Sequence, residues 1–256
     1  MNSNYDLTTD VAVLGAGPGG CATSLFLSQL GVRHIVFDKA TFPRDKVCGD
    51  AVSGKALAIL KKINPDLPKK MARHPEAFAP SWGVSFVASS GTKVEIPFKL
   101  NHQGLEYPVG FVCRRIDFDH LLFQELPSPY ATVMAGMAVT EVVYDDDGVV
   151  LNFKNGSSQG VCHAKMVVGA EGDRSIVAKK LAGHQMDPDH YCAALRAYYR
   201  NVSGVHPENF IELFYIEDLN PGYFWIFPLP NNTVNVGLGM LSSHVRKKHL
   251  QLKNIL

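Results

Sequence analysis

The chain has 256 residues, of which 46% are hydrophobic, and its formal net charge is +1. Such a chain is long and apolar enough to bury a large core, in one domain or two. The near-neutral charge excludes a broad electrostatic attraction to nucleic acid or to an anionic membrane. The five cysteines form no Cys-x-x-Cys pair and the histidines no His-x-His pair. This pattern favours a reducing compartment and predicts no metal site.

Residues 1–9 are polar and show no signal-peptide pattern. No apolar run approaches the roughly 20 residues that a membrane-spanning helix needs. We therefore expect a soluble, cytoplasmic protein without a transmembrane segment, and leave open a peripheral contact with a membrane.

The first element is an apolar strand over Val11–Leu14 that runs into the motif Gly15-x-Gly17-x-x-Gly20. A helical segment follows to Leu30, Gly31 ends it, and a second strand covers His34–Asp38. A strand, a glycine-rich turn, a helix and a second strand that ends in an acid form the context in which this motif indicates dinucleotide binding.

Each part of the motif has a physical role. Gly15 permits the tight turn, Gly17 lets the backbone approach a pyrophosphate, and Gly20 lets the helix pack closely on the strand. The helix N-terminus, with Pro18 in its first turn, offers free N–H groups to phosphates. Asp38 lies where an acid accepts hydrogen bonds from a ribose.

Further along the chain, residues 61–80 indicate a helix end and a loop, and residues 85–112 indicate short antiparallel strands. The spacing of apolar residues predicts a helix over 117–126. Strands are then predicted over 131–144, 149–153 and 161–170. Asp145–Gly148 and Asn155–Gly156 are the turns between them, so the three consecutive aspartates indicate a turn rather than a cation site.

From Tyr191 the chain is β-like and rich in aromatic residues, and residues 245–256 are expected to form a helix. The fold class is therefore α/β, a Rossmann-like nucleotide-binding domain with an antiparallel-sheet domain inserted. The expected boundaries are 1–80 and 113–188 for the nucleotide-binding domain, 81–112 and 189–245 for the sheet domain, and 246–256 for the start of a helix.

Four further segments bear on function. In Phe42–Ser53, Arg44 and Lys46 are able to neutralise phosphate, and Cys48 is a candidate for flavin contact but only a weak one for catalysis. Cys113–Leu122 has an arginine at the start of a helix, and Val168–Ser175 runs from a strand through a glycine turn. In Asn220–Pro230, Tyr223, Trp225 and Phe227 share one strand face by the two-residue period.

In these motifs the chain resembles the FAD-dependent geranylgeranyl reductases within the p-hydroxybenzoate-hydroxylase-like flavoproteins. The segment Lys46-Val-Cys-Gly-Asp-Ala resembles the family's flavin segment, and Arg115-x-x-Phe-Asp119 resembles its phosphate-binding helix. Pro221-Gly-Tyr-x-Trp-x-Phe-Pro228 resembles the signature of the reductase branch. The resemblance implies FAD contacts from Gly15, Gly17, Pro18, Gly20, Asp38, Lys39, Arg44, Lys46, Cys48, Gly49, Asp50, Arg115, Val139, Glu171 and Gly172, and a substrate wall of Tyr223, Trp225 and Phe227.

Three departures from the family pattern stand out. Glu171 replaces the usual Asp, Ala51 stands where Gly is common, and no Gly-Asp-Ala-Ala element follows Val236. Members of the family are also longer than this chain. We therefore expect a C-terminally truncated chain that binds FAD weakly.

The resemblance implies a reductase of C=C bonds in an isoprenoid chain, such as a geranylgeranyl lipid or a prenylated quinone. Reduced FAD would deliver hydride, and NAD(P)H or another donor would supply the electrons. Two alternatives stay open. One is an FAD-dependent monooxygenase of an aromatic or apolar substrate, and the other is a non-catalytic prenyl- or lipid-binding protein on the same fold.

Overall fold

The computed structural model describes residues 6–156, 158–248 and 251–255. The chain divides into two compact units, Met1–Arg44 with Ile116–Gln185, and Asp45–Arg115 with Met186–Leu256. The division places residues 45–80 with the sheet unit, whereas the sequence predicted the nucleotide-binding domain up to residue 80. These residues group there because the short strands β3 (Ala51–Val52) and β4 (Ala79–Ser81) both pair with β7 (Gly110–Val112).

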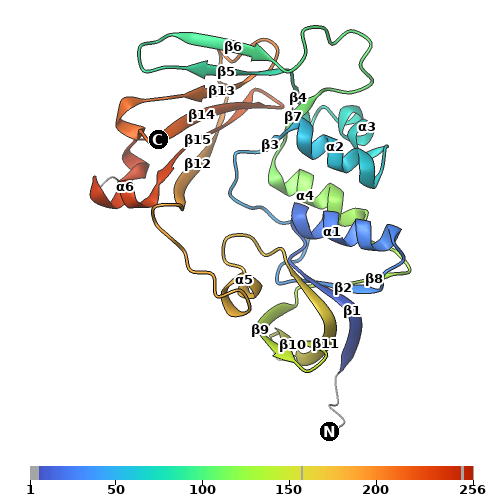
Figure 1. The fold of residues 1–256 in the computed structure, drawn as a ribbon. Coiled ribbons are helices and arrows are strands. Elements are labelled where there is room, and N and C mark those ends of the chain that lie inside the picture. The colour runs from blue at the N-terminus through green and yellow to red at the C-terminus, as the bar shows by residue number, and fades with distance from the viewer. Residues whose placement is uncertain (1–5, 157, 249–250, 256) are drawn as a thin grey trace. The chain divides into compact units, whose positions relative to one another are not determined.

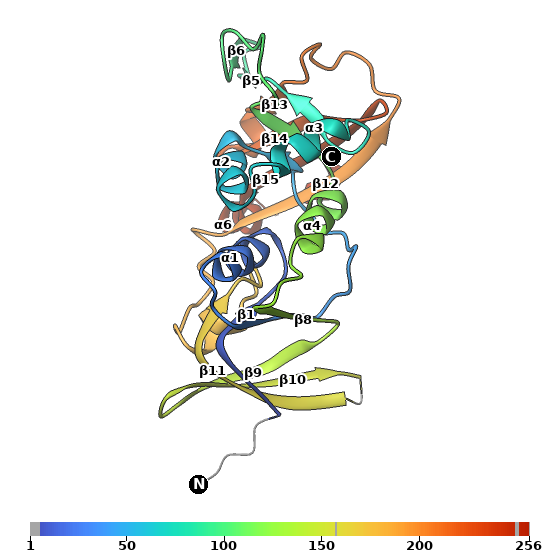
Figure 2. The ribbon, with the colours of Figure 1, turned by 90° about the vertical axis from the view of Figure 1, so that its right-hand side faces the viewer.

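The first unit is built on a six-stranded sheet in the order β8-β2-β1-β11-β10-β9 (Figure 1). Its strands are β1 (Leu7–Leu14), β2 (His34–Asp38), β8 (Ala131–Ala135), β9 (Ala138–Asp145), β10 (Gly148–Asn155) and β11 (Ser158–Gly169). The pairs β8–β2, β2–β1 and β1–β11 are parallel, and β9–β10 and β10–β11 are antiparallel. Figure 2 shows β9, β10 and β11 side by side.

Helices cover both faces of this sheet. Helix α1 (Pro18–Gln29) lies on one face, where Ser24 Oγ bonds the buried His34 Nε2 at 2.7 Å. On the other face, Ala12, Leu14, Ile35 and Phe37 form a core with residues of β9–β11, against which α5 (Ile176–Lys180) packs. The alternation of β1 and β2 between the two faces is the arrangement expected of a Rossmann-like sheet, and the predicted fold class is confirmed.

Two predictions for the first unit need adjustment. The expected strand 131–144 is two strands, because Gly136 adopts a φ of +80° and turns the chain after β8. The expected helix 117–126 is α4 (Arg115–Gln124), with Phe118 and Leu122 buried as its spacing predicts. The hairpin turns at 145–148 and 155–156 are confirmed.

The second unit contains a six-stranded sheet in the order β12-β15-β14-β13-β5-β6 and a three-stranded sheet, β3-β7-β4. The large sheet consists of β5 (Gly83–Val87), β6 (Lys93–Pro97), β12 (Cys192–Arg200), β13 (Ile211–Phe214), β14 (Gly222–Leu229) and β15 (Thr233–Leu241). All its pairs are antiparallel except β13–β5. The predicted sheet character of this region is confirmed.

Alternate residues of β14 serve two different cores. Trp225, Phe227 and Leu229 pack with Val112 on one face of the large sheet. Phe224 packs on the other with a cluster that includes Leu238, Leu252 and Val245 of α6 (Ser242–Lys247). This division follows from the two-residue period of a strand.

The helices of the second unit correct two predictions. Residues 61–80, expected to be a helix end and a loop, contain the end of α2 (Gly54–Ile63) and the whole of α3 (Leu67–Arg73), whose Leu67 and Met71 are fully buried. The continuous helix expected over 245–256 is wrong. Helix α6 ends at Lys247, and a separate 3-10 turn covers Leu252–Asn254, while residues 249, 250 and 256 lie outside the described chain.

Candidate functional site

The glycine turn after β1 is dictated partly by the fold itself. Gly15 has a φ of +97°, and a Cβ there would lie 2.5 Å from the carbonyl oxygen of Ala170. A Cβ on Gly20 would lie 1.7 Å from the carbonyl oxygen of Gly15. Side chains at these two positions would therefore break the packing of strand, turn and helix, whatever the turn binds.

Gly17 is different, because the fold does not require a glycine there. A Cβ at this position would approach only the end of a flexible side chain, Arg44 Nη2, at 3.4 Å. Gly17 is the N-cap of α1, Pro18 follows it, and no side chain among the described residues caps this helix end. The turn thus presents uncapped backbone amides beside a space that a Cβ would fill, which suits a phosphate.

Asp38 fixes the end of β2 against this turn. Its Oδ2 accepts a hydrogen bond from the backbone N–H of Ala16 at 2.7 Å, and its Oδ1 accepts one from Ala40 at 2.8 Å. A carboxylate has about four lone-pair positions, so two remain for a ligand hydroxyl. The geometry therefore fits both a structural role and the predicted ribose contact.

Arg44 is held at the turn by a buried acid. Its Nη1 lies 2.7 Å from Oδ2 of Asp119, whose side chain is fully buried on α4. The guanidinium also lies 5.0 Å from the centre of the Phe42 ring, which stacks on Phe123. An arginine fixed in this way keeps its charge beside Gly17 without the entropy cost of a free side chain, which fits the predicted phosphate contact.

The remaining candidates of the first unit have diverse surroundings. Lys39 is exposed, and the half-buried Val139 packs against the core next to β10. The carboxylate of Glu171 accepts hydrogen bonds from Ser175 Oγ and from the N–H of Ile176, and Ser175 is the N-cap of α5. The cofactor contacts of Glu171 and Gly172 stay predictions.

In the second unit, the segment 45–50 is anchored to one face of the large sheet. Arg196 Nη2 on β12 donates to Oδ2 of Asp45 at 2.7 Å. Asn235 Nδ2 on β15 donates to the carbonyl oxygen of Cys48 at 2.9 Å. A Cβ on Gly49 would lie 2.9 Å from the ring of Phe227, so glycine is needed for this close approach.

Lys46 is exposed, Cys48 is half-buried, and Asp50 is almost fully buried. Arg115 is half-buried at the start of α4. Their contacts with a cofactor remain predictions. Burial is the largest influence on the Asp50 carboxyl and raises its pKa, and hydrogen bonds from Tyr198 and Asn235 oppose that shift.

The aromatic strand β14 places its three candidates on one face, as the period predicts. The rings of Tyr223 and Trp225 lie 6.0 Å apart, and those of Trp225 and Phe227 lie 6.1 Å apart. Trp225 and Phe227 are only 7% and 8% exposed, whereas Tyr223 is 40% exposed. A Cβ on Gly237 would lie 2.1 Å from the indole, so the absence of a side chain there makes room for it.

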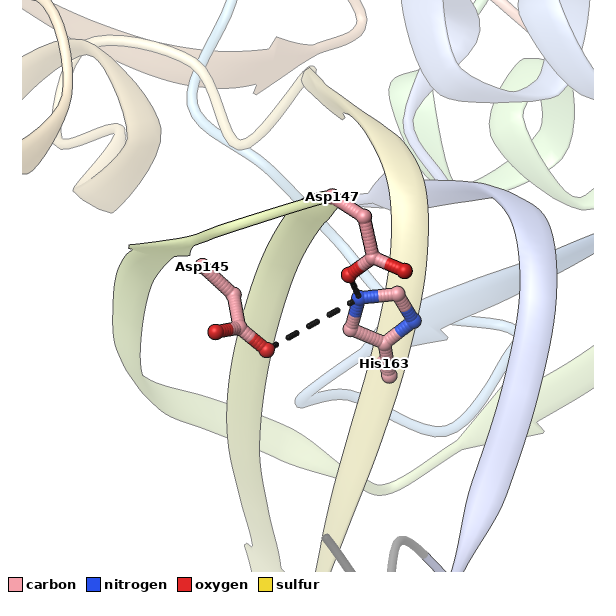
Figure 3. A group of neighbouring side chains, drawn as sticks. All are labelled: Asp145, Asp147 and His163. Atoms are coloured by element: carbon pink, nitrogen blue, oxygen red, sulfur yellow. Dashed lines mark ion pairs between the residues drawn. The ribbon is translucent and has the colours of Figure 1, made fainter. Parts of the chain in front are cut away.

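One further group of titratable side chains lies on the β9–β11 hairpins (Figure 3). His163 Nε2 lies 3.0 Å from Oδ1 of Asp147 and 4.0 Å from Oδ2 of Asp145. The side chain of Asp147 is 82% exposed. The group lies at the hairpin turn that the sequence predicts, and its ligand atoms lie close enough together to suit a cation.

Sequence reasoning missed three residues that organise the two sites. Asp119 was quoted only as part of a motif, although it anchors Arg44. Tyr198 and Asn235 were given no role, although both bond the Asp50 carboxylate. No short-range pattern signals such pairs, because Asp50 and Asn235 lie 185 residues apart.

The chain matches the family model described as FAD binding domain over residues 8–247, and it belongs to this family. The menaquinone reductase of Mycobacterium tuberculosis is 30% identical over 259 residues, covering 99% of this chain and 60% of that protein. The digeranylgeranylglycerophospholipid reductase of Methanocella arvoryzae is 30% identical over 255 residues, with 97% and 60% covered. The chain thus spans about 60% of the length of these relatives. The sequence resemblance to the geranylgeranyl reductases is confirmed.

Solved structures support the same fold. A geranylgeranyl bacteriochlorophyll reductase-like protein from Thermoplasma acidophilum has a TM-score of 0.78 and 23% identity, with 97% of this chain and 60% of that chain covered. The flavin-dependent halogenase CmlS also has a TM-score of 0.78, with 24% identity and 95% and 44% covered. Among the described residues, no helix combines the length and apolar character needed to cross a membrane.

Proposed function

We propose that this chain forms the FAD-binding part of a reductase that saturates C=C bonds in an isoprenoid chain, carried by a lipid or a quinone. The observation that carries the cofactor assignment is the space at Gly17. It lies between uncapped amides of α1 and the anchored guanidinium of Arg44. Backbone amides and a fixed arginine together suit the pyrophosphate of a dinucleotide.

The residues of the first unit would bind and orient the cofactor. Gly17 and the first turn of α1 would hold phosphate, Arg44 would balance its charge, and Asp38 would accept a ribose hydroxyl. When bound, the flavin supplies hydride for the reduction. Lys46, Cys48 and Gly49 are the second unit's candidates for contact with it, and NAD(P)H is the proposed source of electrons.

The aromatic face of β14 supports the choice of an apolar substrate. Of the three rings, Tyr223 is 40% exposed, and Trp225 and Phe227 are buried next to it along the strand. The rings are largely hydrocarbon with few polar atoms, which suits an isoprenoid chain better than a polar one. The relatives named as menaquinone reductase and digeranylgeranylglycerophospholipid reductase point to the same substrate class. The buried Trp225 would exclude water, and the partly exposed Tyr223 would be the first ring that a substrate meets.

The function is tested by single-turnover product analysis. The purified chain is loaded with FAD, reduced without oxygen by NADPH or dithionite, and mixed with a menaquinone or with a geranylgeranyl phospholipid. After any quinol has been reoxidised to the quinone in air, we expect a product heavier by two hydrogens, with the added mass in the isoprenoid chain as shown by fragmentation in the mass spectrometer. A product heavier by one oxygen, formed only in air, would instead establish a monooxygenase. Tight lipid binding without flavin binding would establish a carrier protein.

A further inference from the structure

A buried chain of hydrogen bonds in the second unit links Asp50 to Trp225. The Asp50 side chain is 1% exposed, and its Oδ2 accepts from Tyr198 Oη at 2.6 Å and from Asn235 Nδ2 at 2.7 Å. Asn235 is fully buried, and its Oδ1 accepts from Trp225 Nε1 at 2.9 Å. The backbone carbonyl of Cys48 is the second acceptor for Asn235 Nδ2.

This arrangement determines which way the Asn235 amide points. Its NH2 group faces two oxygens, one from Asp50 and one from Cys48, so its oxygen must face Trp225. A flipped amide would set its NH2 group against the indole N–H and its oxygen against the carboxylate. Both contacts would then be repulsive in a buried region, where unmade hydrogen bonds are costly. Asp50 therefore fixes the acceptor that the indole needs.

The backbone and the packing add two independent signs that this geometry is specified. Asp50 has a φ of +68°, a conformation that residues other than glycine adopt rarely and that recurs at functional sites. Gly237 leaves the space in which the Trp225 ring lies over β15. The orientation of the Trp225 ring thus depends on its hydrogen bond to Asn235 and on the space that Gly237 leaves for it.

We propose that Asp50 and Asn235 are positioning residues that set the orientation of the Trp225 ring, and thereby the shape of the face that receives the apolar substrate. The part that concerns the substrate rests on the function proposed above. The part that concerns the ring requires neither flavin nor substrate.

Arg196 favours the carboxylate form of Asp50, against the larger effect of burial, which raises the pKa of this group. Arg196 lies 4.1 Å above the Tyr198 ring, contributes a positive charge and pairs with Asp45. Its pairing with Asp45 also supplies a control, because Asp45 anchors the same segment by a contact that does not involve Asn235.

The test uses the fluorescence of Trp225 in a Trp82→Phe background, which removes the second of the two tryptophans. We expect Asp50→Ala to shift the emission to longer wavelength and to raise quenching by acrylamide, because the freed amide no longer fixes the indole. Asp50→Asn keeps an acceptor oxygen and should retain the original spectrum, and so should the control Asp45→Ala. Asn235→Ala removes the oxygen that accepts from the Trp225 N–H and should shift the emission in the same way. It replaces Asp50→Ala in the test if that variant does not fold.

Unchanged emission in folded Asp50→Ala or Asn235→Ala would overturn the proposal, as would an Asp50→Asn spectrum equal to that of Asp50→Ala. In a chain that turns over a prenyl substrate, Asn235→Ala should raise KM about fivefold, the equivalent of one lost hydrogen bond. An unchanged KM beside a shifted emission would refute the effect on substrate. Absence of turnover in the unsubstituted chain would count against the proposed function alone, and the fluorescence result would still decide the positioning.

Discussion

The glycine turn of the first unit and the aromatic face of the second are built on opposite principles. At the turn, backbone amides face the ligand, the side chains of Arg44 and Asp38 lie beside them, and glycines create the room for it. On the aromatic face, the groups are large side chains whose positions depend on Asn235, Gly237 and other distant residues. The turn is thus specified locally along the chain, and the face is specified by contacts formed only in the folded unit.

The largest effect is expected where the turn supports the fold. Gly20→Ala should lower the free energy of unfolding of the first unit by about 4 kcal/mol or more, a loss as large as severe overpacking of a core produces. The reason is the 1.7 Å approach of its Cβ to the carbonyl oxygen of Gly15. Urea denaturation measures the change. Gly19→Ala is the matched control, because its Cβ would meet nothing within 4 Å.

The comparison is sharpened by a side-chain contact at the turn, the ion pair of Arg44 with Asp119. Asp119→Ala should cost about 3 kcal/mol in the free energy of unfolding, because it removes one partner of a buried ion pair. The Arg44 side chain is 19% exposed, so water can solvate part of its charge once Asp119 is removed. The expected loss of stability is therefore at the low end of the range for a broken buried ion pair. Gln124→Ala, at the exposed end of the same helix, is the control. A loss below that of the control would show that Arg44 is held by other contacts.

The sequence was sufficient for the glycine turn because its determinants lie close together. Gly15, Gly17, Gly20 and Asp38 fall within one strand–helix–strand unit, and period and turn chemistry locate them. The shared face of Tyr223, Trp225 and Phe227 was also predictable from the strand period. Such local signals gave the fold class and most of its elements.

Other features depend on packing that no local pattern encodes. Helix α3 was missed because lysines and a proline masked the apolar residues Leu67 and Met71, which are buried only in the folded unit. The strand expected over 131–144 breaks at Gly136, whose backbone N–H donates to the carbonyl oxygen of Ala40. The role of Asn235 depends on a partner far away in the sequence.

On the aromatic face, Gly237 differs from Gly17. The space beside Gly17 is open to a ligand, whereas the space beside Gly237 is occupied by the Trp225 ring. Gly237→Ala should displace the Trp225 indole and cost about 1–3 kcal/mol, the usual range for overpacking. Gly239→Ala is the control, since its Cβ would come no closer than 3.4 Å to any atom. Thermal denaturation and Trp fluorescence follow the change. Equal stability of the two variants would mean that the ring adjusts without strain.

A smaller, pH-dependent effect is expected at Asp50. Burial raises the pKa of this carboxyl, so the folded chain holds its proton to higher pH than the unfolded chain does. Protonated Asp50 therefore contributes to the free energy of unfolding. This contribution is fully present below about pH 4, the ordinary pKa of an aspartic acid, and is lost as the pH rises through the pKa of the folded chain. Asp50→Asn does not titrate.

The stability of Asp50→Asn relative to the unsubstituted chain should therefore increase with pH. Each unit by which the pKa is raised corresponds to about 1.4 kcal/mol. Urea denaturation of both chains between acidic and neutral pH measures the difference. A difference that stays constant, or that changes in the opposite direction, would show that the carboxyl titrates normally in the folded chain.

The central claim is that the space at Gly17 receives the phosphates of FAD, and one titration tests it directly. FAD is titrated into the unsubstituted chain, Gly17→Val and Gly19→Val, with flavin fluorescence as the signal and far-UV circular dichroism as the check on folding. The account predicts that Gly17→Val stays folded but binds FAD about 100-fold more weakly, a change of about 2.7 kcal/mol, while Gly19→Val binds as the unsubstituted chain does. Equal affinity of folded Gly17→Val and the unsubstituted chain would contradict the account.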